Sequence, residues 1–249
     1  MRGTTRQSRG MAWVDEVSPF GTPIADRAGV SPTEVLIGQT VGLTGPVGAV
    51  AREVVLGTQA LLQSVNDAGG IHGRRLCLLT LDDAHEPSRI VHNLHHLARV
   101  DTVFALANLT GVVNCPVGAP LMEVWSTPCV GWMVGAPADS RQLVWQVLTA
   151  HARRSVHPPV QAWQLWLSYQ VAMRRLGALR LSAASLEAYL HARLLSDAMR
   201  LCGPDLCRSR LVAVVRGLAE SVACGLPLGT SARAQPQVLS HKGPGASEL

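Results

Sequence analysis

The residue pair best placed to do acid–base chemistry is Asp82-Asp83, at the end of an apolar run. Paired carboxylates can act as a general acid and a general base. Neighbouring residues of a strand point to opposite faces, so one carboxylate is expected to cap loop amides while the other faces solvent. No nucleophile motif accompanies the pair. The two aspartates therefore indicate a structural turn and not a catalytic site.

Histidines form the second group that could carry chemistry. His92 and His96 lie four residues apart on a predicted helix, a spacing that can bind a metal ion. The glutamate that metalloproteases place between two such histidines is absent. Leu94 and Leu97 occupy the buried face of that helix, so the histidines are expected to be solvated. The sequence predicts no metal site and no cofactor.

A glycine loop is the third candidate. Gly42, Gly45 and Gly48 follow a short apolar run and precede a helix, where backbone amides could hold a phosphate. The lysine of phosphate-binding loops and the spacing of dinucleotide-binding loops are both absent. The loop is thus expected either to face a small ligand with its backbone or to be a plain strand-to-helix turn.

Alternating strands and helices position these groups. Apolar runs predict strands, and amphipathic stretches predict helices between them; the strands are expected at 35–40, 76–81, 103–106 and 129–133. Runs that are apolar on both sides predict a parallel sheet covered by helices on both faces. In such a sheet, ligands bind in the loops after the carboxyl ends of the strands. Here those loops are expected at 43–48, 82–86, 108–114 and 134–136.

Three segments carry a family resemblance: the loop 43–46, the helix end 65–76 with its Asn-Asp-Ala-Gly-Gly, and the acidic turn 81–87. In this order and spacing they resemble the periplasmic-type solute-binding proteins of ABC transporters, in particular the branched-chain amino acid (Leu/Ile/Val) binding family. The resemblance implies an α/β chain: a periplasmic binding protein type I lobe with a parallel sheet, followed by a mainly helical C-terminal remnant of the second lobe.

The resemblance and the composition divide the chain into four parts. A disordered leader is expected at 1–32, the ligand-binding lobe one at 33–136, a helical remnant of lobe two at 137–225, and a disordered tail at 226–249. Roughly a hundred residues of the second lobe are expected to be missing after Pro137.

Without the strands of lobe two, several apolar side chains of the predicted C-terminal helices should lack packing partners. They are Trp163, Trp166, Leu190 and Leu194. Exposed apolar area of this kind predicts self-association.

By resemblance, ligand contacts fall on the loops at the carboxyl ends of the strands. The implied ligand-binding residues are Leu43, Thr44, Gly45, Asp82, Asn108, Thr110, Gly111, Val112, Asn114 and Val134. Val112 and Val134 stand where the family offers hydroxyl groups. Two polar contacts would therefore be lost, and a site built for hydrogen bonds loses selectivity without them.

The charge of the chain bears on its binding partners, and its targeting signals bear on its cellular location. The net charge is +5, yet no basic run or stripe is present, so no nucleic-acid partner is expected. The resemblance implies a periplasmic location. No apolar segment of a signal peptide is visible after Arg2, Arg6 and Arg9, which leaves a cytoplasmic location open.

The function implied by the resemblance is that of the substrate-binding component of an ABC transporter for amino acids or a similar small solute, either working or internally deleted. Its partners would be the small-molecule ligand and an ABC permease, and no enzymatic activity is expected. The alternative is an amide-sensing or protein-contact regulatory module built on one lobe of the same fold, which the absence of a visible signal peptide favours.

Overall fold

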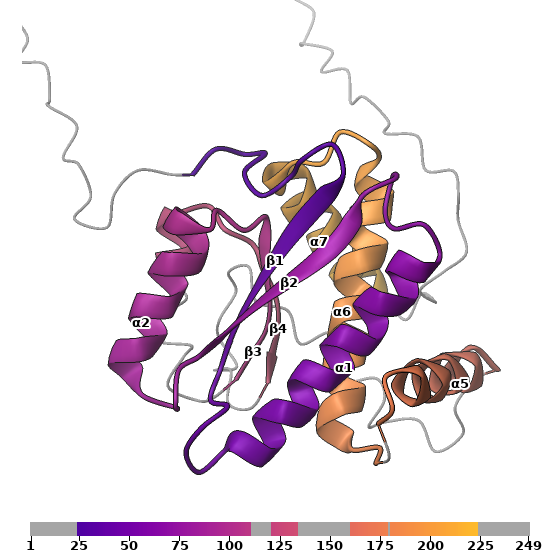
Figure 1. Cartoon of the computed structure of the whole chain (residues 1–249). Coiled ribbons are helices and arrows are strands. Elements are labelled where there is room, and N and C mark those ends of the chain that lie inside the picture. Colours follow the sequence, from indigo (N-terminus) through magenta and orange to yellow (C-terminus); the bar gives the residue numbers. More distant parts are fainter. Residues whose placement is uncertain (1–23, 111–120, 134–159, 179, 224–249) are drawn as a thin grey trace, which may run out of the picture.

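The computed structural model describes residues 24–110, 121–133, 160–178 and 180–223. Its elements are, in chain order, β1 (Glu34–Val41), α1 (Gly48–Asp67), β2 (Arg75–Asp82), α2 (Pro87–His95) with the π-helical turn η1 (His96–Val100), β3 (Ala105–Thr110), β4 (Cys129–Met133), α5 (Val160–Arg175), α6 (Ala183–Cys202) and α7 (Arg208–Ala223) (Figure 1).

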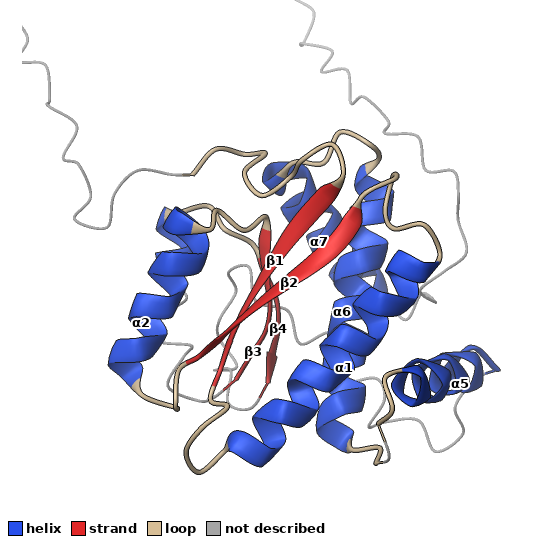
Figure 2. Ribbon diagram, viewed as in Figure 1, coloured by secondary structure: helices blue, strands red, loops and turns tan. Residues whose placement is uncertain are grey.

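The four strands form one parallel sheet in the order β2-β1-β3-β4. The predicted parallel α/β architecture is thereby confirmed (Figure 2). The bounds of β1 and β2 differ from the predicted ranges by one residue at each end, and β3 differs most. It runs on to Thr110, so the predicted loop at 108–114 begins as a strand. Leu109 pairs with Trp132 and Thr110 with Met133, and this pairing with β4 is not visible in the local sequence of β3.

Side chains of the sheet alternate between two cores, as expected for a sheet covered on both faces. Val35 and Ile37 of β1 face the core made with α1, α5, α6 and α7. Leu36 faces the opposite core, which Ile90 and Leu94 of α2 help to fill. The sheet therefore lies between two helical layers.

Helix α6 packs against α1 and against strands β3 and β4. The two helices cross so closely at Gly57 that an added Cβ atom would lie 2.0 Å from the Ser185 carbonyl oxygen. Leu190 and Leu194 are consequently only 7% and 4% exposed. The expectation that these two residues would lack packing partners is wrong, because α1 and the sheet of lobe one supply them.

The other two apolar residues of that expectation lie on α5. Trp166 is partly buried against the larger core, whereas the side chain of Trp163 lies outside the described residues. Leu167 and Val171 of α5 remain 56% and 49% exposed. Self-association through α5 stays a prediction.

A buried arginine joins α7 to the start of β3. Arg208 is 1% exposed, and its guanidinium donates hydrogen bonds to the carbonyl oxygens of Val103 at 2.6 Å and Phe104 at 3.2 Å. Burial lowers the pKa of Arg208 to about 10, so the side chain remains charged at neutral pH. The first turn of α7 is thus anchored to the sheet by charge-assisted hydrogen bonds.

A matched distortion interrupts strands β3 and β4. Asn108 and Gly131 lie opposite each other, and both have a positive φ, 51° and 86°. This backbone turns the Asn108 side chain toward the α1–α6 layer, where its amide nitrogen donates to Thr58 Oγ1 at 2.8 Å and to the Ala188 carbonyl oxygen at 2.9 Å. A Cβ atom at residue 131 would lie 2.6 Å from Asn108 Oδ1, so this position has no room for a side chain.

His191 of α6 completes the polar cluster around Asn108. Its Nδ1 lies 3.1 Å from Asn108 Oδ1. Because the Asn108 oxygen can only accept, Nδ1 carries the hydrogen in the neutral ring. The other ring nitrogen, Nε2, is buried without a hydrogen-bond partner. Burial lowers the pKa of His191 to about 4, so the imidazole is neutral at pH 7.

Because the helices cross so closely at Gly57, adding one methyl group there should lower the stability of the protein strongly. Gly57→Ala should destabilise the protein by about 1–3 kcal/mol or more, because the helices must separate to admit it. Gly217→Ala on α7 is the matched control, since a Cβ atom there meets nothing within 4 Å. The control should gain up to about 1 kcal/mol from helix propensity. Urea unfolding measures both, and an unchanged stability of Gly57→Ala would contradict the α1–α6 packing.

Buried His191 predicts a loss of stability in mild acid. The folded-state pKa of about 4 lies below the ordinary value of 6.5, so the unfolded chain binds the proton first. The stabilising contribution is complete above pH 6.5 and falls as the pH drops toward 4, by about 3 kcal/mol in all. Urea unfolding between pH 7 and pH 4 should therefore show a smaller pH dependence for His191→Gln than for wild type. His92→Gln, at an exposed position, is the matched control.

Candidate functional site

The candidate site lies at the carboxyl edge of the sheet. From β1 the chain passes to β2 on one side and then to β3 on the other, so the strand order reverses between β1 and β3. Ligands of open α/β sheets commonly bind at such a reversal. The end of β1 meets the end of β3 there, because the Gly42 amide lies 3.4 Å from Thr110 Oγ1. The loop from β1 to α1 and the loop from β2 to α2 border the same edge.

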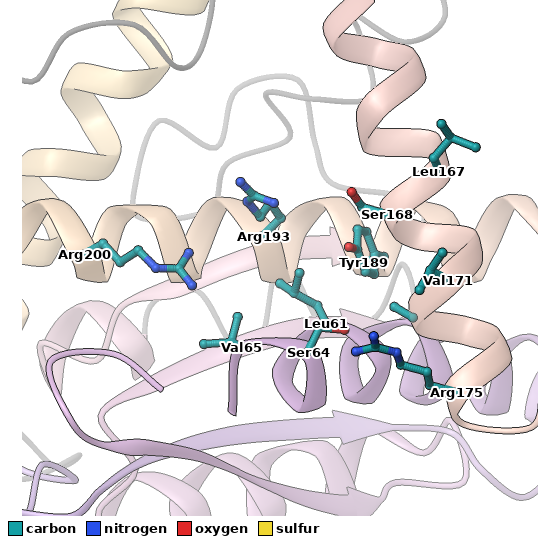
Figure 3. Close-up of a pocket in the computed structure, with 11 residues that line it drawn as sticks. Leu61, Ser64, Val65, Leu167, Ser168, Val171, Arg175, Tyr189, Arg193 and Arg200 are labelled. Atoms are coloured by element: carbon teal, nitrogen blue, oxygen red, sulfur yellow. The ribbon is translucent and has the colours of Figure 1, made fainter. Parts of the chain in front are cut away.

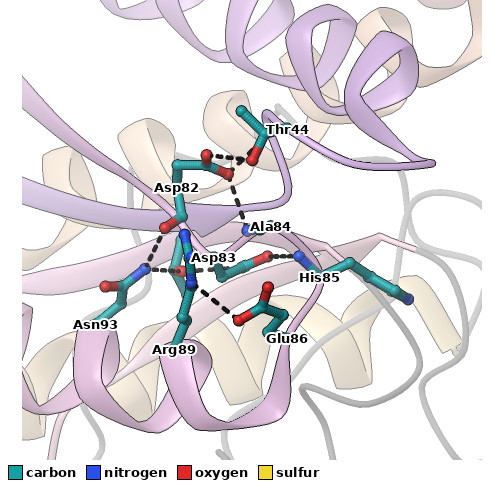
Figure 4. Close-up of polar contacts among 9 residues, drawn as sticks. Thr44, Asp82, Asp83, Ala84, His85, Glu86, Arg89 and Asn93 are labelled. Atoms are coloured by element: carbon teal, nitrogen blue, oxygen red, sulfur yellow. Dashed lines mark hydrogen bonds and ion pairs between the residues drawn. The ribbon is translucent and has the colours of Figure 1, made fainter.

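Asp82 links these two loops by hydrogen bonds (Figure 4). Its carboxylate accepts hydrogen bonds from the Thr44 hydroxyl at 2.7 Å, the Thr44 amide at 3.2 Å and the Ala84 amide at 2.9 Å. Partial burial raises the pKa of Asp82, but the hydrogen bonds from Thr44 and Ala84 outweigh it and hold the pKa below its ordinary value. Asp82 is therefore anionic at neutral pH and is engaged within the protein.

Asp83 is fully buried beneath the turn. It accepts a hydrogen bond from Thr40 Oγ1 at 2.9 Å and one from the His85 amide at 2.8 Å. Burial raises the pKa of Asp83, and the hydrogen bonds from His85 and Thr40 only partly offset this effect. The expectation that one of the two aspartates faces solvent is wrong. The strand ends at Asp82, so the alternation of faces no longer applies to its neighbour.

The turn after Asp83 has an unusual backbone. Ala84 and His85 both have a positive φ, 50° and 62°. Gly45 in the neighbouring loop also has a positive φ, and its ideal Cβ position is 3.1 Å from the Ala84 carbonyl oxygen. The two loops therefore pack backbone against backbone.

Helix α1 begins at this edge without a cap. Its N-cap residue Val47 provides no side-chain hydrogen bond, and the first turn contains no acidic residue. The amides of a helix N-terminus carry a partial positive charge and bind anions such as a carboxylate. Arg52, one turn into the helix, reinforces the loop by donating to the Leu43 carbonyl oxygen at 3.1 Å. The edge can thus receive an anionic group of a ligand.

The structure brings together some of the residues predicted for the site. Leu43, Thr44, Gly45 and Asp82 lie at one place, and Thr110 lies beside them through Gly42. Asn108 instead lies inside the α1–α6 layer with its amide engaged by protein groups. The remaining predicted residues lie outside the described part of the chain: Gly111, Val112, Asn114 and Val134. Ligand contact by any of these ten residues stays a prediction.

Sequence reasoning missed the supporting residues of this edge. Thr40 links Asp83 to Asn93, whose amide nitrogen donates to Thr40 Oγ1 at 3.1 Å and to the Asp82 carbonyl oxygen at 3.1 Å. Gln39 donates to the Asn108 carbonyl oxygen at 3.2 Å. The available signal was the pair of polar residues, Gln39 and Thr40, within an otherwise apolar strand.

The histidines of α2 and η1 are not part of the candidate site at the carboxyl edge of the sheet. The His92 and His96 rings are 6.2 Å apart, and His96 Nδ1 lies 2.9 Å from an Asp101 carboxylate oxygen. Within the described ranges, no group of three or more histidine, cysteine, aspartate or glutamate side chains is placed to hold a metal ion. None of the four cysteines in those ranges, at 77, 129, 202 and 207, forms a disulfide. No helix of the described ranges has the length and apolar character to cross a membrane.

Comparison with known sequences matches residues 34–155 to the family model described as periplasmic binding protein. Leu/Ile/Val-binding protein homolog 3 of Brucella melitensis is 32% identical over 96 residues, which are 39% of this chain and 26% of that protein. Leu/Ile/Val-binding protein BraC3 of Rhizobium johnstonii is likewise 32% identical over 96 residues, with the same coverage. The matched segment thus spans about a quarter of the length of these relatives.

Solved structures show the same fold. A possible leucine/isoleucine/valine-binding protein from Rhodopirellula baltica aligns with a TM-score of 0.61 at 18% identity, covering 78% of this chain and 88% of that one. An extracellular ligand-binding receptor from Verminephrobacter eiseniae aligns with a TM-score of 0.60 at 15% identity, covering 73% and 89%. Residues 34–155 are therefore similar in sequence to the periplasmic binding protein family, and the chain shares the fold of these solved structures.

Proposed function

We propose that this protein is the substrate-binding component of an ABC transporter, which captures an amino acid or a similar small solute outside the cytoplasm for a permease. The uncapped N-terminus of α1, at the reversal point of the sheet, carries the proposal. The related Leu/Ile/Val-binding proteins of Brucella melitensis and Rhizobium johnstonii support the ligand class. Permease and ATPase genes next to this one would support the transport role.

The α1 N-terminus suits the carboxylate of an amino acid. Backbone amides and the helix dipole attract an anion there, and no acidic side chain of the first turn competes for them. Asp82 holds the preceding loop in place through Thr44, so the ligand does not have to order that loop on binding. A preorganised loop lowers the entropic cost of association.

This lobe offers fewer hydrogen-bond partners to the ammonium group of an amino acid than to its carboxylate. The carboxylate oxygens of Asp82 and Asp83 already accept hydrogen bonds from groups within the protein. Two-lobed binding sites enclose the ligand, and each lobe contributes hydrogen bonds. A single lobe that holds the carboxylate should therefore bind weakly.

Titration with leucine tests this proposal. Losing two charge-assisted hydrogen bonds, at about 1.5–3 kcal/mol each, moves a micromolar site to millimolar or weaker. Millimolar leucine should shift the NMR signals of the Gly45 and Ala49 amides. Leucinamide, which lacks the carboxylate, should not shift them.

Two other results would change this conclusion in different ways. A saturable micromolar isotherm with leucine, isoleucine or valine in calorimetry would support the binding function but contradict the expected weak binding, because the pocket would then be complete. Tighter binding of leucinamide than of leucine would favour the alternative, an amide-sensing regulatory module.

The Asp82–Thr44 contact predicts the effect of one further substitution. Thr44→Val removes the 2.7 Å hydroxyl bond and loosens the β1–α1 loop, so leucine should bind several-fold more weakly. Thr33→Val is the matched control, because Thr33 is exposed at the opposite edge of the sheet. Equal leucine affinity in the two variants would show that the loop does not hold the ligand.

A further inference from the structure

A second concave region lies away from the strand ends, between α1, α5 and α6 (Figure 3). It is open to solvent and has a volume of about 510 Å³, within the usual range of small-molecule sites. Its floor comes from the later half of α1, whereas the candidate site above lies at the first turn of that helix. We call this region the α1–α5–α6 hollow.

Apolar side chains make the floor and one wall of the hollow. Leu61 and Val65 of α1 form the floor, and Leu167 and Val171 of α5 form the wall. The two α5 residues remain 56% and 49% exposed, which leaves apolar surface facing the open space. A ligand with an apolar body would remove that surface from water.

Arginines surround this apolar surface. Arg175, Arg193 and Arg200 line the hollow, and the guanidinium groups of Arg175 and Arg200 approach it from opposite ends (Figure 3). Arg193 and Arg200 share one carboxylate, that of Asp197, at 2.7 Å and 2.8 Å. Arg175 has only a 3.7 Å contact with Asp67. The three arginines are therefore paired with only two aspartate carboxylates, which leaves an excess of positive charge.

Tyr189 adds a polar group to the lining of the hollow. It lines the hollow and is only 2% exposed, with its ring packed edge-on against Tyr169 at 5.4 Å. Its hydroxyl makes no hydrogen bond with any residue of the described ranges. Burial raises the pKa of Tyr189, so the hydroxyl keeps its proton and can donate it to an acceptor.

We propose that the α1–α5–α6 hollow binds an organic carboxylate with an apolar chain or ring. The carboxylate would accept hydrogen bonds from the Tyr189 hydroxyl and from the arginine rim, chiefly Arg200. The apolar body would lie on Leu61 and Val65 against the α5 wall. This site is separate from the amino-acid site proposed at the carboxyl edge of the sheet, and neither depends on the other.

Calorimetry on the full chain with three probes tests the proposal. Octanoate combines charge and an apolar chain, octan-1-ol has the chain without the charge, and acetate has the charge without the chain. Octanoate should bind saturably and at least about tenfold more tightly than either of the other two. Leucine at saturating concentration should not displace it, because the amino acid would bind at the strand ends.

Variants locate the bound carboxylate. Tyr189→Phe keeps the ring packing and removes only the hydroxyl, and Arg200→Gln leaves the Arg193–Asp197 pair intact. Each should weaken octanoate binding about tenfold, the expected effect of losing one charge-assisted hydrogen bond. Arg174→Gln is the matched control, since Arg174 is exposed on α5 and does not line the hollow.

Three results would overturn the proposal. They are an absence of saturable octanoate binding, equal binding of octan-1-ol, and octanoate binding that neither Tyr189→Phe nor Arg200→Gln weakens. Circular dichroism confirms that each variant is folded, so a loss of affinity can be assigned to the hollow. Displacement of octanoate by leucine would also count against it, because the two ligands would then share one site.

Discussion

The close crossing of α1 and α6 is the contact on which the rest of the structure depends. Gly57 allows the backbone of α6 at Ser185 to approach α1 without an intervening side chain. Ser182 and Ser185 form a reciprocal capping box at the start of α6, and the Tyr169 hydroxyl lies 2.7 Å from Ser185 Oγ. The start of α6 is thereby fixed at the crossing. From there the helix covers β3 and β4 and closes one face of the sheet.

Helix α1 connects the features of the molecule that could bind ligands. Its first turn opens toward the carboxyl edge of the sheet, its middle meets α6 at Gly57, and its later half forms the floor of the α1–α5–α6 hollow. α6 meets this helix between the two regions, at Gly57. The edge site and the hollow are therefore separate in space but share one rigid support.

The sequence predicted what local patterns determine. Apolar runs located β1, β2 and β4, and amphipathic spacing located α1, α2 and α6. The acidic turn and glycine loop were correctly expected to lie together at the strand ends. These features are local because strand and helix periodicity are set by neighbours along the chain.

Contacts between distant segments were not predictable from a single sequence. The burial of Leu190 and Leu194 depends on which surface α6 meets, and the residues that form this surface lie far away in the chain. The positive φ of Asn108 depends on Thr58, Ala188 and His191, none of which is its neighbour. Asp83 was misjudged because the strand ended one residue earlier than the alternation assumed.

The paired distortion at Asn108 and Gly131 restricts how the two strands can change length. The pairing register is the same before and after it, since Ala107 pairs with Val130 and Leu109 with Trp132. Deleting one of the two residues alone would offset the strands by one position and turn every following side chain to the wrong face of the sheet. Insertions and deletions in β3 and β4 can therefore be accepted only in pairs, one in each strand.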